Sequence, residues 1–203
     1  MPTREALAAA ARDFHARGWM AGTAGNLSAR EPGDRRAFWI TASGRPKGRL
    51  EPEDLVRVRV EDGAVVERLD PEARPSAETA IHRAVYAALP QVGACFHVHT
   101  VEACLASWSA PGPELPLPPL EMLKGLGVME ERPEVGLPLF ENRADVEVLA
   151  GEVAERLRRA PPRVPALLVR RHGLTVWGAG PQEAYDRVEL LAFILDYLAR
   201  GGR

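Results

Sequence analysis

The order of strand-like and helix-like segments is the feature of this sequence that most constrains its fold. Residues 56–60 alternate valine with arginine, residues 64–69 form a second strand-like run, and the turn Asp62-Gly63 between them is typical of a β-hairpin. Further strand-like runs lie at 38–41, 93–99, 165–171 and 174–177, and helical patterns lie at 3–17, 76–89, 101–108, 145–159 and from Pro181 onward. No regular strand–helix–strand alternation is present. We therefore expect one α/β domain over residues 1–203, with α/β/α layers around a mostly antiparallel sheet.

Composition and charge exclude several classes of protein. The 203 residues include 26 Lys and Arg against 28 Asp and Glu, so the chain lacks the positive excess that nucleic-acid binding needs. No apolar run approaches the roughly 18 residues of a membrane helix, and the apolar stretch 6–11 is too short for a secretory signal. The two cysteines, Cys95 and Cys104, have no metal-binding or redox spacing. We expect a cytoplasmic protein that binds neither nucleic acid nor membrane.

Histidines at the ends of two predicted strands form the first candidate site. In His97-Val98-His99 both imidazoles leave the same face of a strand, roughly 7 Å apart, and can converge on one ion. The spacing alone fits two unrelated histidines equally well. His172 also ends an apolar strand and precedes Gly173, which allows a sharp turn. Three imidazoles with one open position suit a catalytic ion, zinc or another late first-row metal.

The other histidines and two carboxylates have ordinary structural explanations beside any functional one. His15 lies near a predicted helix C-terminus, where a cation favours the helix dipole, and His82 lies one turn after Glu78, so both are interpreted as structural. Cys95 is interpreted as a small core residue. Glu78 falls in the first turn of a helix, which is a sufficient reason for an acid there. Glu121 follows the proline-rich segment 109–119, which we expect to be irregular, and is a second acid/base candidate.

Three short loops of small polar residues are candidates for binding a phosphate group. They contain Gly25-Asn26, the run Thr41-Ala42-Ser43-Gly44, and Ser76 before a helix. Backbone N–H groups in such turns and at a helix N-terminus bind phosphate without net positive charge. Ordinary turns have the same composition, so the loops alone do not separate the two interpretations.

Taken together, these motifs resemble the class II aldolase/adducin family over nearly the whole chain. The segments that carry the resemblance are Gly-Thr-Ala-Gly-Asn-Leu-Ser at 22–28, Ile-Thr-Ala-Ser-Gly at 40–44, Pro-Ser-Ala-Glu-Thr at 75–79, His-Val-His at 97–99 and Arg-Arg-His-Gly at 170–173. The resemblance implies one zinc ion per subunit on His97, His99 and His172, a small phosphorylated ketose as substrate, and a homotetramer. A sugar-phosphate aldolase or 4-epimerase, and a metal-free interaction domain like that of adducin, are the alternatives.

Within this family, three segments resemble the dehydratases that act on a methylthio-substituted ribulose phosphate in methionine salvage. They are 47–50 (Lys-Gly-Arg-Leu), 121–125 (Glu-Met-Leu-Lys-Gly) and 169–177. The resemblance implies Glu121 as the catalytic acid/base and adds Lys47 to the substrate-binding residues Gly25, Asn26, Thr41, Ser43, Gly44 and Ser76. In the aldolases of the family the acid/base is the carboxylate that matches Glu78. The chain has both carboxylates, and the sequence leaves the choice open.

Overall fold

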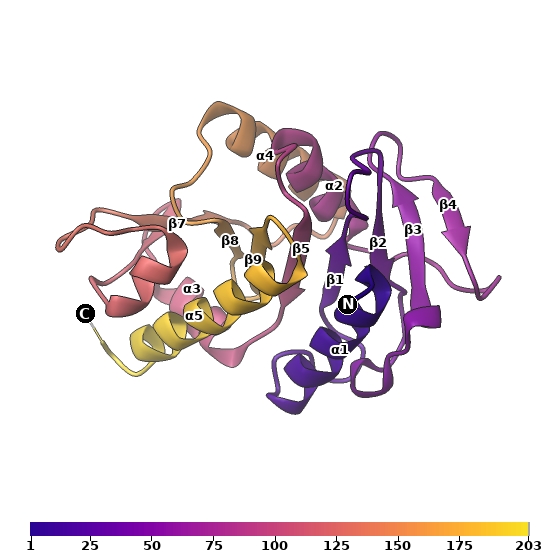
Figure 1. Ribbon diagram of the computed structural model, residues 1–203. Helices are drawn as coiled ribbons and strands as arrows, with labels where there is room; N and C mark the ends of the chain where they lie inside the picture. Colours follow the sequence, from indigo (N-terminus) through magenta and orange to yellow (C-terminus); the bar gives the residue numbers. More distant parts are fainter. Residues whose placement is uncertain (203) are drawn as a thin grey trace.

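A continuous nine-stranded sheet forms the centre of the molecule. The structure is a computed structural model, and it describes residues 1–202. The strands lie in the order β4-β3-β2-β1-β5-β9-β8-β7-β6 (Figure 1). All neighbouring pairs are antiparallel except β7 and β8, which are parallel. The strands are β1 (Asn26–Ala29), β2 (Ala37–Thr41), β3 (Leu55–Arg59), β4 (Val65–Arg68), β5 (Ala94–Val98), β6 (Glu114–Pro116), β7 (Gly136–Phe140), β8 (Ala166–Val169) and β9 (Gly173–Gly178).

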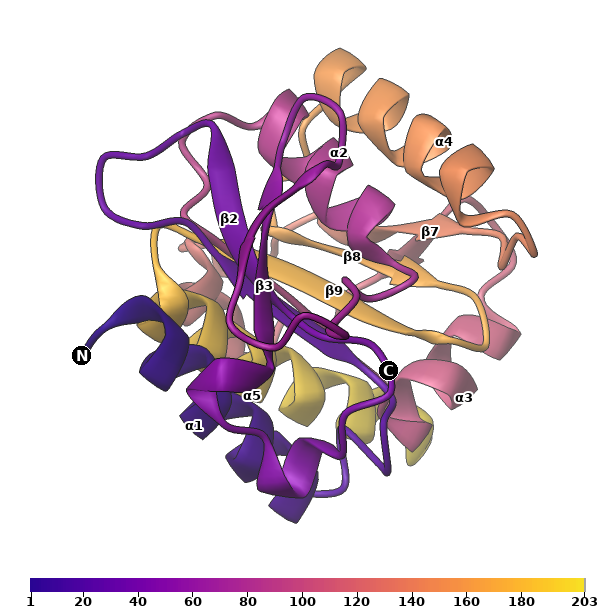
Figure 2. The ribbon, with the colours of Figure 1, turned by 90° about the vertical axis from the view of Figure 1, so that its right-hand side faces the viewer.

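Helices cover both faces of this sheet. Figure 2 shows α2 and α4 on one side of it and α1, α3 and α5 on the other. The α-helices are α1 (Thr3–Ala16), α2 (Thr79–Ala88), α3 (Val101–Ser109), α4 (Val146–Arg159) and α5 (Pro181–Ala199), and the short 3-10 helices are η1 (Lys47–Arg49), η2 (Pro52–Asp54) and η3 (Glu121–Leu126). The predicted α/β/α layers and the mostly antiparallel sheet are confirmed.

The central strands are apolar because both of their faces are covered. Strands β5, β8 and β9 are buried along their whole length, as expected for a sheet between two helical layers. Side chains alternate across β5: Cys95 packs in the cluster under α2 and α4, and Phe96 packs in the cluster with α1 and α5. By the same alternation, His97 points to the side from which α2 begins. The side chain of His97, one of the candidate ligands, therefore points toward the start of α2.

Two local predictions differ from the structure. The segment 109–119, expected to be irregular, contains β6, which pairs with β7 at the edge of the sheet where proline is tolerated. Helix α2 begins at Thr79, three residues after the predicted cap Ser76. Ser76 still supports the helix start, since its carbonyl accepts a hydrogen bond from the backbone N–H of Thr79 at 3.1 Å.

None of the helices in residues 1–202 combines the length and the apolar character that are needed to cross a membrane.

Candidate metal centre

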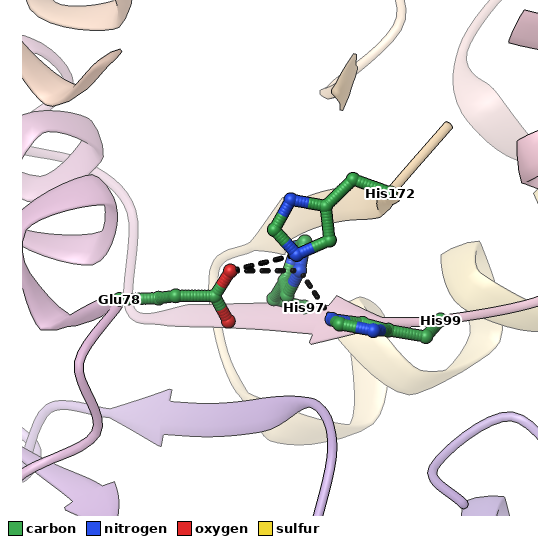
Figure 3. Close-up of side chains that lie close together, drawn as sticks. All are labelled: Glu78, His97, His99 and His172. Atoms are coloured by element: carbon green, nitrogen blue, oxygen red, sulfur yellow. Dashed lines mark hydrogen bonds and ion pairs between the residues drawn. The ribbon is translucent and has the colours of Figure 1, made fainter. Parts of the chain in front are cut away.

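The pairing of β5 with β9 brings the three strand-end histidines together. His97 lies in β5 opposite Thr175 of β9, and His99 follows β5 directly. His172 lies in the tight connection from β8 to β9, and this connection therefore adjoins the end of β5. The Nε2 atoms of His97 and His99 are 2.9 Å apart, and the three ring centroids lie 4.7 to 5.1 Å from one another (Figure 3). The arrangement predicted from the strand period is present in the fold.

Glycine at position 173 allows the close approach of the two strands at this point. A Cβ atom there would lie 2.5 Å from the carbonyl oxygen of Val98 and 3.0 Å from Cε1 of His97. Arg171, two residues earlier, has a φ of +55°, which is uncommon for a residue with a side chain. The chain thus turns sharply enough to place His172 over His97.

Glu78 completes the cluster from the residue that precedes α2. Its Oε1 atom is 2.9 Å from Nε2 of His172 and 3.6 Å from Nε2 of His97 (Figure 3). One ligand atom from each of Glu78, His97, His99 and His172 lies within 4.8 Å of the others. From the sequence, Glu78 had a sufficient explanation as an acid at a helix start. The structure shows that it also faces the histidines.

Burial and neighbouring groups together set the protonation states of this cluster. Desolvation lowers the pKa of His97 to about 4, and desolvation together with the nearby His97 and His172 lowers that of His99 to about 3, so both are neutral at pH 7. Burial alone would raise the pKa of Glu78. The opposite effect of His97, His172 and Asn26 is larger, so the pKa is lowered overall and the carboxylate is ionised. The Thr175 hydroxyl lies 2.8 Å from His97 Nδ1, which leaves Nε2 toward the cluster. Three imidazoles and a carboxylate fit a zinc-like divalent ion.

Asn26 and His82 support Glu78 from its other side. The Asn26 Nδ2 donates to Oε2 of Glu78 at 2.6 Å, and the Asn26 Oδ1 lies 2.6 Å from Nε2 of His82. Asn26 is 2% exposed, and both polar atoms of its side chain are engaged. The side chain of Asn26 is therefore not available to a substrate phosphate, and the predicted contact with the phosphate remains a prediction for its backbone N–H only. The sequence signal for His82 was its position one turn after Glu78.

The three loops predicted to bind phosphate lie against one another. Buried Lys47 donates from Nζ to the carbonyl of Thr23 at 2.8 Å and to that of Arg45 at 3.1 Å, which ties the turn before β1 to the loop after β2. Ser43 N–H donates to the carbonyl of Arg74 at 2.8 Å, which ties the same loop to the segment that holds Ser76. These hydrogen bonds connect the three loops to one another.

The individual loop residues differ in how their polar groups are used. The Thr41 hydroxyl accepts from the backbone N–H of Leu27 at 3.3 Å, and the Ser76 hydroxyl accepts from that of Glu78 at 3.4 Å. Gly44 is exposed with a φ of +71°. Gly25 has a φ of +75°, and a Cβ there would lie 2.9 Å from the carbonyl oxygen of His97. The loop before β1 therefore packs directly on the strand that carries the histidines.

Burial also changes the charge on Lys47. The side chain is 1% exposed, and desolvation lowers its pKa from 10.5 to about 8, partly offset by the negative charge of Asp54. Lys47 is therefore a cation at neutral pH that lies in the protein interior with two carbonyl partners. Its charge contributes to the low pKa of His99, so the loops and the histidine cluster interact electrostatically.

Glu121 lies apart from the four-residue cluster within one chain. It begins η3, its side chain is 74% exposed, and it forms an ion pair with Lys124 at 2.9 Å. The structure does not bring it to the histidines, and its role as acid/base stays a prediction. His15 contacts the carbonyl of Met20 at 3.0 Å near the end of α1, and Cys95 is buried in the core, both consistent with their structural interpretation.

Comparisons with known proteins agree with the geometry. The model of the class II aldolase and adducin N-terminal domain matches residues 5–198. Methylthioribulose-1-phosphate dehydratase from Microcystis aeruginosa is 50% identical over 195 residues, which cover 96% of this chain and 94% of that protein. The enzyme of the same name from Leptospira biflexa is 40% identical, with 92% and 91% of the two chains covered.

Solved structures show the same fold. The crystal structure of L-fuculose-1-phosphate aldolase from Thermus thermophilus is 31% identical with a TM-score of 0.73, covering 95% of this chain and 91% of that one. A putative aldolase/epimerase/decarboxylase from Escherichia coli is 26% identical with a TM-score of 0.80, covering 98% and 89%. By its relatives the chain is an enzyme of the lyase class. It belongs to the class II aldolase and adducin family.

Proposed function

We propose that the chain is a zinc-dependent dehydratase that converts 5-methylthioribulose 1-phosphate to 5-methylthio-2,3-dioxopentyl phosphate and water in methionine salvage. The 50% identity to a methylthioribulose-1-phosphate dehydratase over 96% of the chain carries the proposal. The cluster of three histidines with Glu78 supports the need for a metal.

His97, His99 and His172 would hold the zinc ion, with Glu78 beside them. When bound, the ion would act as a Lewis acid on the C2 carbonyl and so acidify the proton on C3. The neutral imidazoles of His97 and His99 supply nitrogen ligands without first having to lose a proton, and the Glu78 carboxylate offsets part of the positive charge. Imidazole nitrogens beside a carboxylate are a donor set that suits a late first-row divalent ion.

The C1 phosphate would bind in the loops around Lys47. The backbone N–H groups of Gly25 and Gly44 and the side-chain hydroxyl of exposed Ser43 are candidates, and the Lys47 ammonium supplies the positive charge. Lys47 has three N–H donors and uses two of them on backbone carbonyls. The third donor would bind a phosphate oxygen.

Glu121 is proposed as the acid/base that takes the C3 proton and returns a proton to the hydroxyl that leaves C4. One supporting argument concerns Glu78, whose lowered pKa makes its carboxylate a weak base for taking the C3 proton. A second is that the Glu121 side chain is exposed and can reach a substrate from outside its own subunit. We propose a homotetramer in which Glu121 meets the site of a neighbouring subunit.

The test is incubation of the zinc-loaded protein with 5-methylthioribulose 1-phosphate while the diketone absorbance is followed. The matched control is the His99→Ala protein prepared in the same way. Appearance of the diketone with the wild type and not with the variant supports the proposal. Zinc-loaded protein that leaves the substrate unchanged contradicts it.

A sugar-phosphate aldolase or 4-epimerase is the second candidate, because Glu78 faces the histidines and the Thermus thermophilus aldolase shares the fold at 31% identity. In that case the protein would cleave L-fuculose 1-phosphate and release dihydroxyacetone phosphate, or invert C4 of a pentulose phosphate. A coupled assay for dihydroxyacetone phosphate on the same preparation separates cleavage from dehydration.

A further inference from the structure

A row of buried hydrogen bonds leads from Glu78 away from the histidines and into the core. Asn26 contacts Glu78, His82 contacts Asn26, the Ser28 hydroxyl lies 2.7 Å from His82 Nδ1, and the Tyr86 hydroxyl lies 2.8 Å from Ser28 Oγ. The four supporting side chains are each at most 2% exposed. We refer to Tyr86, Ser28, His82, Asn26 and Glu78 as the buried polar chain. The reaction as proposed above makes no use of it beyond Glu78.

The direction of every hydrogen bond in this buried polar chain follows from the orientation of the Asn26 amide. Its Nδ2 donates to Oε2 of Glu78, so its Oδ1 faces His82. Oδ1 only accepts, so His82 must carry its proton on Nε2. Desolvation lowers the pKa of His82 to about 4, so the ring is neutral and Nδ1 is left as an acceptor for the Ser28 hydroxyl.

At the Tyr86 end of the buried polar chain, the hydrogen bonds run in the same direction. The single Ser28 proton is directed to His82 Nδ1, with the Cys95 carbonyl as a second acceptor at 3.2 Å, so Tyr86 must donate to Ser28 Oγ. Donation therefore runs from Tyr86 through Ser28, His82 and Asn26 to Glu78. A buried amide whose two ends face different groups has one correct orientation, and His82 is the group that fixes it.

We propose that His82 is a positioning residue for the metal centre. Its Nε2–H holds the Asn26 amide so that Nδ2 donates to Oε2 of Glu78, which leaves Oε1 directed at the histidine nitrogens. This inference rests on the proposed function only in taking the Glu78 and histidine cluster as a metal site. Loss of such an outer partner typically lowers metal affinity about 10- to 100-fold.

The first test reads the tautomer of His82 directly, in metal-free wild-type protein. Nitrogen-15 NMR of the histidine rings distinguishes a protonated Nε2 from a protonated Nδ1. The polar chain requires His82 with Nε2 protonated and Nδ1 free at pH 7. A ring with its proton on Nδ1 would overturn the proposal, because Asn26 could not then donate to Glu78. The measurement needs neither a variant nor turnover.

The second test measures zinc affinity by competition with a chelator in a double-mutant cycle. His82→Leu has similar volume and no hydrogen-bonding atoms, and we expect it to weaken zinc binding about 10- to 100-fold. In a Glu78→Ala background the same change should weaken binding no further, because His82 acts through Glu78. An equal loss in both backgrounds would show a general structural effect and would overturn the proposal, as would no loss in either.

Matched variants separate positioning from packing. His82→Gln can present an N–H donor near the Nε2 position and should regain most of the affinity lost in His82→Leu. Tyr86→Phe keeps the ring in the core and leaves the Ser28 donation intact, so its zinc affinity should stay within about twofold of wild type. A loss in Tyr86→Phe as large as in His82→Leu would contradict the proposal. If His82→Leu does not fold, two other variants test the proposal. We expect near-normal zinc affinity in His82→Gln and reduced zinc affinity in Ser28→Ala. Reduced affinity in His82→Gln with near-normal affinity in Ser28→Ala would refute the proposal.

The outcomes also separate this inference from the proposed function. A protein whose zinc affinity depends on His82 but which leaves 5-methylthioribulose 1-phosphate unchanged contradicts the dehydratase and not the role of His82. A protein that dehydrates this substrate and binds zinc equally well with and without His82 contradicts the role of His82 and not the dehydratase.

Discussion

Replacing Lys47 by methionine tests whether a buried cation lies beside the site. Methionine has a similar length and no charge, so it fills the space and removes only the ammonium. The Lys47 side chain is 1% exposed, and burial lowers its pKa from 10.5 to about 8. The native protein therefore releases this proton more easily than the unfolded chain does. The difference between the two states sets a dependence of stability on pH.

The sign and size of that dependence follow from proton linkage. Between pH 8 and pH 10.5 the unfolded chain keeps the Lys47 proton while the native protein has lost it. Because the unfolded state then binds more protons, the free energy of unfolding rises with pH, by up to about 1.4 kcal/mol per pH unit. Across the window this group contributes about 3 kcal/mol. Below pH 8 both states hold the proton, and the contribution is constant.

Urea unfolding of the metal-free wild type and of Lys47→Met, at matched protein concentration and at several pH values from about 7 to 10.5, measures the effect. The stability of the wild type relative to the variant should increase by about 3 kcal/mol over this range, whatever its value at neutral pH. Other titrating groups are common to both proteins and cancel. A difference that stays constant with pH would refute the argument that Lys47 is a buried cation.

The remaining predictions concern the histidines, the two carboxylates and one loop. His99→Ala should lose bound zinc and turnover together, and full zinc occupancy measured by elemental analysis would contradict its assignment as a ligand. Glu121→Gln should keep zinc and fold but lose about 10²- to 10⁴-fold in rate, whereas a dead Glu78→Gln beside an active Glu121→Gln would indicate the aldolase arrangement. Gly25→Ala should destabilise the protein by about 1–3 kcal/mol in thermal unfolding, because the added Cβ would meet the carbonyl oxygen of His97. The control is Gly22→Ala, which should cost less, because Gly22 also has a positive φ, +61°, but a Cβ there would have nothing within 4 Å.

The histidine cluster was predictable from sequence because it depends on local periodicity. A period of two along β5 places His97 and His99 on one face, and the sharp turn at Gly173 places His172 at a neighbouring strand end. The partners of these residues depend on contacts between distant parts of the chain. Asn26 and Glu78 are 52 residues apart. The pairing of β1 with β5 places Asn26 opposite His97, and Glu78 reaches Asn26 from the start of α2. For this reason the sequence explained Glu78 only as an acid at a helix start and did not place it beside the histidines.

The fold was predicted for similar reasons and missed where the local pattern is weak. The β3–β4 hairpin carries a clear alternation and an Asp-Gly turn, and α5 begins at Pro181 as its sequence indicates. Strand β6 has three residues in a proline-rich segment, and no pattern of that length distinguishes it from a loop. Its partner, strand β7, lies at least twenty residues further along the chain. Edge pairing of this kind is decided by tertiary structure.

The charges of the site imply that metal and phosphate binding favour one another. Without ligands, the Glu78 carboxylate and the Lys47 ammonium are opposite charges in a mostly buried region, and the cation already lowers the pKa of His99. A divalent ion adds two positive charges among the histidines, and a phosphate dianion adds two negative charges near Lys47, so each ligand reduces the electrostatic cost of the other. Zinc affinity measured by chelator competition should therefore increase in the presence of saturating inorganic phosphate. By reciprocity, phosphate affinity should rise by the same factor when zinc is bound. In Lys47→Met, which lacks the cation proposed to bind the phosphate, the coupling should fall. Equal zinc affinity with and without phosphate in the wild type would contradict the proposed placement of the phosphate beside Lys47.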